Sequence, residues 1–231
     1  MNKKSKKLKK SKQSKQSKQS KQSKQSKQSK QSKQSKQSKQ SQKVNQFVCT
    51  GNTCRSAALQ ALARAIYPEL IFESCGTGVR KGKEGEGMSI PMVMRIKAKS
   101  LKKKSKLLDP KIYKKALKHA KSHKSRSCNC KNIMKVSNSG GIMFVVADSN
   151  ISNLKKIINE CSKNDKTFKK PKITKIDEKD IIDGYDKSCE LLERQGKVCN
   201  KKSRKIERKE YKISLKQIVK ALKSNTDINK L

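Results

Sequence analysis

The chain has 231 residues, with 61 lysines and arginines against 18 aspartates and glutamates, and therefore a net charge of +43 at neutral pH. Its hydrophobic share of 32% lies below that of an ordinary globular chain, so part of the sequence cannot belong to a core. We expect neither a membrane-spanning helix, which needs an apolar run of ~18 residues, nor a secretory signal, because the basic N-terminus is followed by no apolar region.

Residues 1–43 have the composition of a disordered tail. They contain 17 lysines and no acidic residue, and ten consecutive Ser-Lys-Gln triplets run from Ser11 to Gln40. Leu8 is almost the only large apolar side chain, so the segment cannot bury enough surface to offset the entropy of ordering. A polycationic tail predicts salt-sensitive, non-specific binding to nucleic acid or an anionic surface, and a low-complexity expansion without a specific role is the alternative.

The next stretch predicts a strand, a tight turn and a helix. Val44–Cys49 is a short apolar run, as expected for a buried parallel strand. Gly51 and Asn52 tolerate the positive φ with which a loop turns its N–H groups inward around an anion. Arg55 can grip two phosphate oxygens, and the helix that begins near it adds its N-terminal N–H groups. This positive field favours a thiolate at Cys49, within reach of the Ser56 hydroxyl, so the pattern predicts a phosphate-binding loop around a nucleophilic cysteine. A buried structural cysteine is the alternative.

The string Cys-Thr-Gly-Asn-Thr-Cys-Arg-Ser at residues 49–56 resembles the signature of the low-molecular-weight protein tyrosine phosphatases. The resemblance implies an α/β domain over residues 44–231, with a four-stranded parallel sheet and helices on both faces, in flavodoxin-like order. It also implies hydrolysis of phosphotyrosine on a phosphorylated protein substrate, through a cysteinyl-phosphate and without a metal or other cofactor. Cys49 is then the nucleophile and Arg55 a catalytic residue. The substrate-binding residues are Thr50, Gly51, Asn52, Thr53, Cys54 and Ser56.

Two positions of the loop bear on specificity and regulation. Thr53 stands where typical tyrosine-specific members carry Ile or Leu, and the string resembles the protein-arginine phosphatases of the same family. A threonine hydroxyl can form hydrogen bonds in the pocket, so phosphoarginine is the alternative substrate. Cys54 could trap an oxidised Cys49 as a reversible disulfide, or it could merely pack under the loop.

Helical spacing follows the loop as far as Pro68, and Leu70–Phe72 predicts a second strand. Ser74–Thr77 resembles the turn with which the family supports its phosphate loop. Residues 78–140 match the family least, and we expect an insertion there, with helices over Met88–Leu101 (Leu101 facing inward) and Lys111–Lys121.

His119 and His123 lie four residues apart, and Cys128 and Cys130 follow them. Two His and two Cys could form a zinc site, but the Cys-x-Cys spacing is unusual for zinc. We expect both imidazoles to lie on a solvated face instead. The sequence at 123–126 also resembles the family's His-x-Ser-Arg turn.

Ile142–Ala147 predicts a central strand followed by a helix that Asp148–Asn150 caps, and Ile173–Ile176 predicts a fourth strand. Asp183, in the string Ile-Ile-Asp-Gly-Tyr, resembles the catalytic acid of the family's Asp-Pro-Tyr loop, although Gly184 replaces the proline. Tyr185 would line the pocket mouth. Apolar spacing from Leu215 to Leu222 predicts a final helix, and the charged span 197–212 before it an irregular linker or an exposed helix.

The eight cysteines are interpreted as mostly free, because a catalytic thiol needs a reducing compartment, and a cytoplasmic protein is expected. Two other functions remain open. Arsenate reduction on the same fold would need a cysteine pair after the third strand, where Cys161 stands alone. A non-catalytic basic binding protein could retain the loop and use its charge to hold a nucleic acid or an acidic partner.

Overall fold

The computed structural model describes residues 42–79, 84–176 and 204–231, with backbone only at 204–212 and 229. The strands are β1 (Val44–Cys49), β2 (Ile71–Gly76), β3 (Ile142–Val145) and β4 (Lys172–Lys175). The helices are α2 (Arg55–Ile66), α3 (Ile90–Ser100), α4 (Pro110–Lys121), α5 (Cys130–Asn138), α6 (Asp148–Asn164), α8 (Arg204–Ser224) and α9 (Thr226–Asn229).

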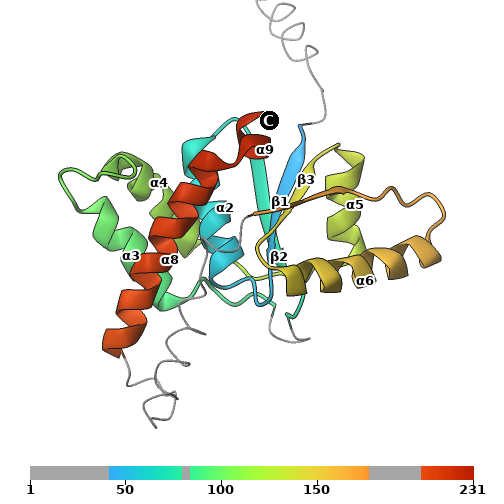
Figure 1. Ribbon diagram of the computed structural model, residues 1–231, viewed down its shortest axis with the longest axis horizontal. Coiled ribbons are helices and arrows are strands. Elements are labelled where there is room, and N and C mark those ends of the chain that lie inside the picture. Colours follow the sequence, from blue (N-terminus) through green and yellow to red (C-terminus); the bar gives the residue numbers. More distant parts are fainter. Residues whose placement is uncertain (1–41, 80–83, 177–203) are drawn as a thin grey trace, which may run out of the picture. The chain divides into compact units, whose positions relative to one another are not determined.

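The four strands form a parallel sheet in the order β2-β1-β3-β4 (Figure 1). The chain moves from β1 outward to β2 and then returns to the other side of β1 to form β3. Ligands of such sheets bind outside the carboxyl ends of the strands, where the strand order reverses. Cys49, the last residue of β1, lies at this point. The predicted four-stranded parallel α/β fold is confirmed.

Helices cover both faces of the sheet (Figure 1), and each face has its own core. Phe47 of β1 is fully buried and its ring stacks on Phe72 of β2, under α2, α3, α4 and α8. Its neighbour Val48 points the opposite way and packs with Val136 of α5 and Leu154 of α6. This alternation follows from the two-residue period of a strand. Because β1 and β3 bury apolar side chains on both faces, the centre of the sheet requires helices on both sides.

The predicted elements largely exist, with corrections at their ends. The prediction that Leu101 faces inward is wrong, since the residue is 75% exposed. It lies nine residues after the buried Met92, and at about 100° per residue this places it on the opposite side of the helix. Asp148 does not cap α6, because Ala147 is the N-cap; the aspartate lies in the first turn and pairs with Lys175.

Further differences concern elements built by long-range contacts. Helix α5 was not predicted, and β2 runs to Gly76, beyond the expected end at Phe72. The C-terminal part of the charged span, residues 204–212, belongs to α8. None of the described helices is long and apolar enough to cross a membrane.

Candidate active site

The loop between β1 and α2 brings a thiol to the carboxyl edge of the sheet. Cys49 ends β1, Cys54 is the N-cap residue of α2, and no side chain caps the helix. The first N–H groups of α2 have no acceptor within the helix, and they carry its positive dipole end. A loop of this kind, which ends at a helix N-terminus, is suited to bind an anion.

The Cys49 thiol is held by two groups of the loop. Its Sγ accepts a hydrogen bond from the Asn52 N–H at 3.3 Å and lies 2.9 Å from Ser56 Oγ. Ser56 Oγ also donates to Asn52 Oδ1 at 3.0 Å. A hydroxyl has a single hydrogen, so it serves one acceptor at a time. Ser56 therefore lies between the Cys49 sulfur and the Asn52 amide and links the two.

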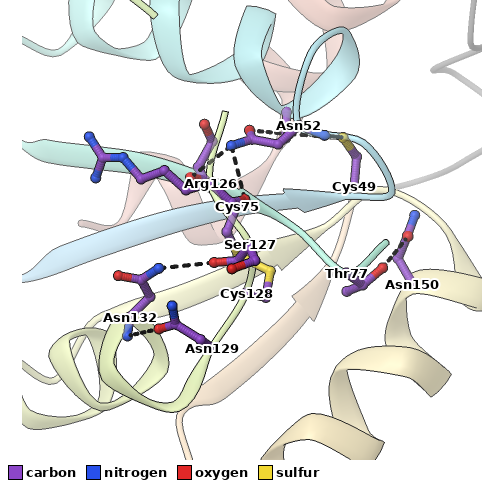
Figure 2. The surroundings of a disulfide bond; sticks show 12 residues. Cys49, Asn52, Cys75, Thr77, Arg126, Ser127, Cys128, Asn129, Asn132 and Asn150 are labelled. Atoms are coloured by element: carbon purple, nitrogen blue, oxygen red, sulfur yellow. Dashed lines mark hydrogen bonds between the residues drawn. A yellow bond between two sulfur atoms is a disulfide. The ribbon is translucent and has the colours of Figure 1, made fainter. Parts of the chain in front are cut away.

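Asn52 fixes the shape of the loop. Its φ is +50°, a left-handed conformation that asparagine tolerates better than most residues, and it is fully buried. Its Nδ2 donates to the carbonyls of Ser74 at 3.3 Å and Arg126 at 3.4 Å, and Figure 2 shows the amide reaching over Arg126. Of the two loop residues that tolerate a positive φ, Gly51 and Asn52, it is Asn52 that adopts it.

His123 supports the loop from inside, so the expectation of a solvated face is wrong. Its ring is 7% exposed, and Nε2 donates to the Asn52 carbonyl at 2.7 Å. Burial lowers the pKa of His123, and the cations Arg126 and Arg64 lower it further, while the bond to Asn52 opposes this shift. His119 is half-buried, and burial together with Arg64 lowers its pKa as well.

The end of β2 lies directly beneath the loop. A Cβ at Gly76 would stand 2.3 Å from the Thr50 carbonyl oxygen and 3.0 Å from the Asn52 nitrogen, so no larger residue fits. Beside it, the hydroxyls of Thr50 and Thr77 both donate to Asn150 Oδ1, at 3.0 and 2.9 Å. Asn150 of α6 thus ties the loop to the second helical layer (Figure 2).

Comparisons with solved structures find this arrangement of strands and helices elsewhere. Vibrio vulnificus Wzb in complex with benzylphosphonate is 13% identical, over 82% of this chain and 99% of that one, with a TM-score of 0.50. A low-molecular-weight protein tyrosine phosphatase from T. tengcongensis is 20% identical over 82% and 99%, with a TM-score of 0.47. The YwlE arginine phosphatase with a phosphorylated active site serine is 17% identical over 80% and 99%, with a TM-score of 0.43.

This chain has the low-molecular-weight phosphatase fold. No protein-family model matches the sequence, and no curated protein matches it either. The likeness extends over most of the chain, but the shared identity is low, so the assignment of chemistry rests on the loop itself.

The other predicted loop residues lie between Asn52 and the first turn of α2. Thr53 is half-buried, and its carbonyl accepts from the Ser89 N–H at 2.7 Å, which joins the loop to the start of α3. Cys54 is buried and not disulfide-bonded, and Arg55 is the first residue of α2. The predicted acid Asp183 and the predicted pocket residue Tyr185 lie outside the described residues.

Two disulfides correct the prediction that the cysteines are mostly free. Cys75 is bonded to Cys128, and Cys130 to Cys161, so of the described cysteines Cys49 and Cys54 are the ones outside a disulfide. Figure 2 shows the first bond joining the end of β2 to the segment that follows Arg126. Two backbone hydrogen bonds join the same segments. The Gly76 N–H donates to the Arg126 carbonyl, and the Cys128 N–H donates to the Gly76 carbonyl. The disulfide therefore holds the support on which the phosphate loop rests.

These bonds also bear on the zinc interpretation. Cys128 and Cys130 are both consumed by disulfides, and the part of the chain that the structure describes contains no group of three or more His, Cys, Asp or Glu placed to hold a metal ion. A zinc site on these residues is therefore wrong.

Sequence reasoning missed two supporting residues: Asn150, which accepts from the loop, and His123 as a buried donor. For His123 the signal was available, in the likeness to a His-x-Ser-Arg turn. Asn150 acts through a contact 100 positions away in sequence, which no local pattern reveals.

Proposed function

We propose that the protein is a cysteine-dependent protein phosphatase. The observation that supports this most directly is the Cys49 sulfur at the carboxyl edge of a parallel sheet, bonded to the Asn52 N–H and the Ser56 hydroxyl, inside a loop that opens on the uncapped start of α2. Such a site favours a thiolate and a tetrahedral oxyanion beside it. A structural cysteine would have no need of these donors.

In the proposed reaction the Cys49 thiolate attacks phosphorus, and the bond from phosphorus to the leaving oxygen breaks. Asp183 gives its proton to that oxygen, which needs one in order to leave. The loop N–H groups and Arg55 stabilise the equatorial oxygens as charge develops on them. Asp183, now ionised, takes a proton from a water molecule that attacks the cysteinyl-phosphate, and inorganic phosphate and the thiolate are released.

Phosphotyrosine on a protein is the proposed substrate, and phosphoarginine is the second candidate because of Thr53. A hydroxyl at that position can form a hydrogen bond to an attacking water or to a polar leaving group, whereas the Ile or Leu of tyrosine-specific members cannot. Thr53 is half-buried in the loop, between Asn52 and the N-cap Cys54.

The proposal includes partners and location. The 17 lysines of residues 1–43 favour weak binding to nucleic acid or an anionic surface. Turnover requires a reduced Cys49, which favours a cytoplasmic setting. The Cys75–Cys128 disulfide would persist there because both of its sulfurs are shielded, with the residues 0% and 5% exposed.

Hydrolysis of an aryl phosphate by the wild type and by Cys49→Ser tests the enzyme proposal. Turnover that disappears in the variant supports it. No turnover in either protein, together with tight salt-sensitive binding to a polyanion, would favour a basic binding protein instead. Arsenate reduction is tested with the same pair of proteins, and a thiol-dependent loss of arsenate would favour that reaction.

The substrate is tested by comparing phosphotyrosine and phosphoarginine peptides as substrates of the wild type and of Thr53→Ile. If Thr53 selects phosphoarginine, the variant loses turnover of that peptide more than of the phosphotyrosine peptide. Equal effects on both peptides would remove the argument from Thr53 and leave phosphotyrosine as the proposed substrate.

A further inference from the structure

A second basic pocket lies behind the phosphate loop, between α2, the end of α4 and residues 122–126. Its polar lining consists of Gln60, Arg64, His119, Ser122, His123, Lys124 and Arg126. Its volume is about 70 Å³, well below the ~300–1,000 Å³ of pockets for drug-sized ligands. A water molecule's share of liquid volume is about 30 Å³, so the space suits a tetrahedral oxyanion rather than an organic molecule.

The positive charge around this pocket is only partly compensated. Glu73 is the carboxylate beside it, and it is shared: its oxygens contact Lys135 and lie 3.7 Å from Arg126 Nη1. Arg64 donates through Nε to the Phe72 carbonyl at 2.6 Å, a neutral acceptor. Burial lowers the pKa of Arg64, and Arg126 lowers it further, while Glu73 opposes the shift. Arg64 and Arg126 are therefore near enough to repel each other.

The pKa values of the two imidazoles also reflect the positive charge in the pocket. The cation of Arg64 lowers the pKa of both His119 and His123, after the larger effect of burial. Nε2 of His123 is occupied by the Asn52 carbonyl, which leaves Nδ1 as its other polar atom. An anion among these groups would reverse the repulsion and favour the protonated form of each ring.

We propose that this pocket binds a phosphate-sized oxyanion, either free or as the terminal phosphoryl group of a larger molecule, at a site separate from the Cys49 loop. Its ligands are the guanidinium of Arg64, the two imidazoles, and the charges of Lys124 and Arg126 at the rim. Since His123 also donates to the Asn52 carbonyl, an occupied pocket strengthens that bond and stiffens the loop.

The chain contains only two histidines, and both line the pocket, so their resonances report on it without interference. We would titrate the full chain by NMR between pH 5 and 8, with and without inorganic phosphate, at a fixed ionic strength set with chloride. Occupancy is expected to raise the pKa of His119 by about one pH unit, in a saturable way. His119 belongs to α4, whereas the hydrogen bond to the Cys49 loop comes from His123. A change in the pKa of His119 therefore distinguishes phosphate bound in this pocket from phosphate bound at the Cys49 loop.

Matched variants assign the site. Lys124→Gln combined with Arg126→Gln removes two charges from the rim, and both side chains are exposed, so the fold should tolerate the change. Lys155→Gln combined with Lys156→Gln removes two exposed charges from α6, on the other face of the sheet. We expect the rim pair to weaken the phosphate effect on His119 about tenfold or more, and the α6 pair to leave it unchanged.

Two results would overturn the proposal: no saturable shift of His119 at any phosphate concentration, or equal weakening by both pairs of substitutions. A nucleoside triphosphate in place of inorganic phosphate identifies the source. If it saturates His119 at a lower concentration, with the same dependence on the rim pair, the ligand is a phosphoryl group carried by a larger molecule. If phosphate binds as tightly or more tightly, the ligand is the free ion.

Discussion

The substitution Asn52→Ala tests the structural basis of the loop, independently of any assumed reaction. It removes three side-chain hydrogen bonds, from Nδ2 to two carbonyls and from Ser56 Oγ to Oδ1. Each is worth about 0.5–1.5 kcal/mol net, and the two from Nδ2 are long, so the lower half of that range applies. Alanine at a φ of +50° adds roughly 1 kcal/mol. The expected destabilisation is therefore about 3 kcal/mol, a large part of the ~5–15 kcal/mol of a typical domain.

Urea unfolding of the full chain measures this loss. With a slope of ~1–3 kcal/mol per molar, the midpoint should fall by roughly 1–3 M. Asn153→Ala is the matched control, because Asn153 is an exposed residue of α6, and its effect should stay within about 0.5 kcal/mol. If Asn52→Ala shifts the midpoint no more than Asn153→Ala does, the Asn52 side chain does not hold the loop, and the role assigned to its hydrogen bonds is wrong.

Three further predictions concern the support of the loop. Gly76→Ala forces its new Cβ against backbone 2.3 Å away. We expect the free energy of unfolding, measured by denaturant titration, to fall by about 1–3 kcal/mol, and the turnover of an aryl phosphate to fall by a larger proportion. Unchanged turnover would contradict the close approach. Replacing both Cys75 and Cys128 by alanine opens a loop of 53 residues, and the free energy of unfolding should fall by about 4 kcal/mol. An unchanged midpoint of thermal unfolding, measured without reductant, would argue against the disulfide. Because burial lowers the pKa of His123 and His119, the folded chain binds fewer protons than the unfolded chain, so stability is present above a pH of about 6.5 and is lost as the pH falls below it. Urea midpoints from pH 5 to 8 measure this, and a midpoint that rises on acidification would refute it.

The local signals in the sequence determined the elements that build the loop. Val44–Cys49 is apolar for most of its length, and a Gly-Asn turn and helical spacing follow, so strand, loop and helix were predicted where the structure shows β1 and α2. The four-stranded parallel sheet was implied by the resemblance of the loop to a known phosphatase family. In each case the information lies within one turn or one strand, where propensity and periodicity act.

Only the tertiary structure decided what the loop rests on. His123 is polar and is surrounded by lysine and serine in the sequence, which favours a solvated interpretation, yet the fold buries it against a carbonyl 71 positions earlier. Likewise, the cysteines carry no local sign of their partners; Cys75 meets Cys128 because β2 and the segment after α4 end at the same edge of the sheet. Pairings of this kind depend on how distant segments pack, and packing is a property of the whole chain rather than of any stretch of it.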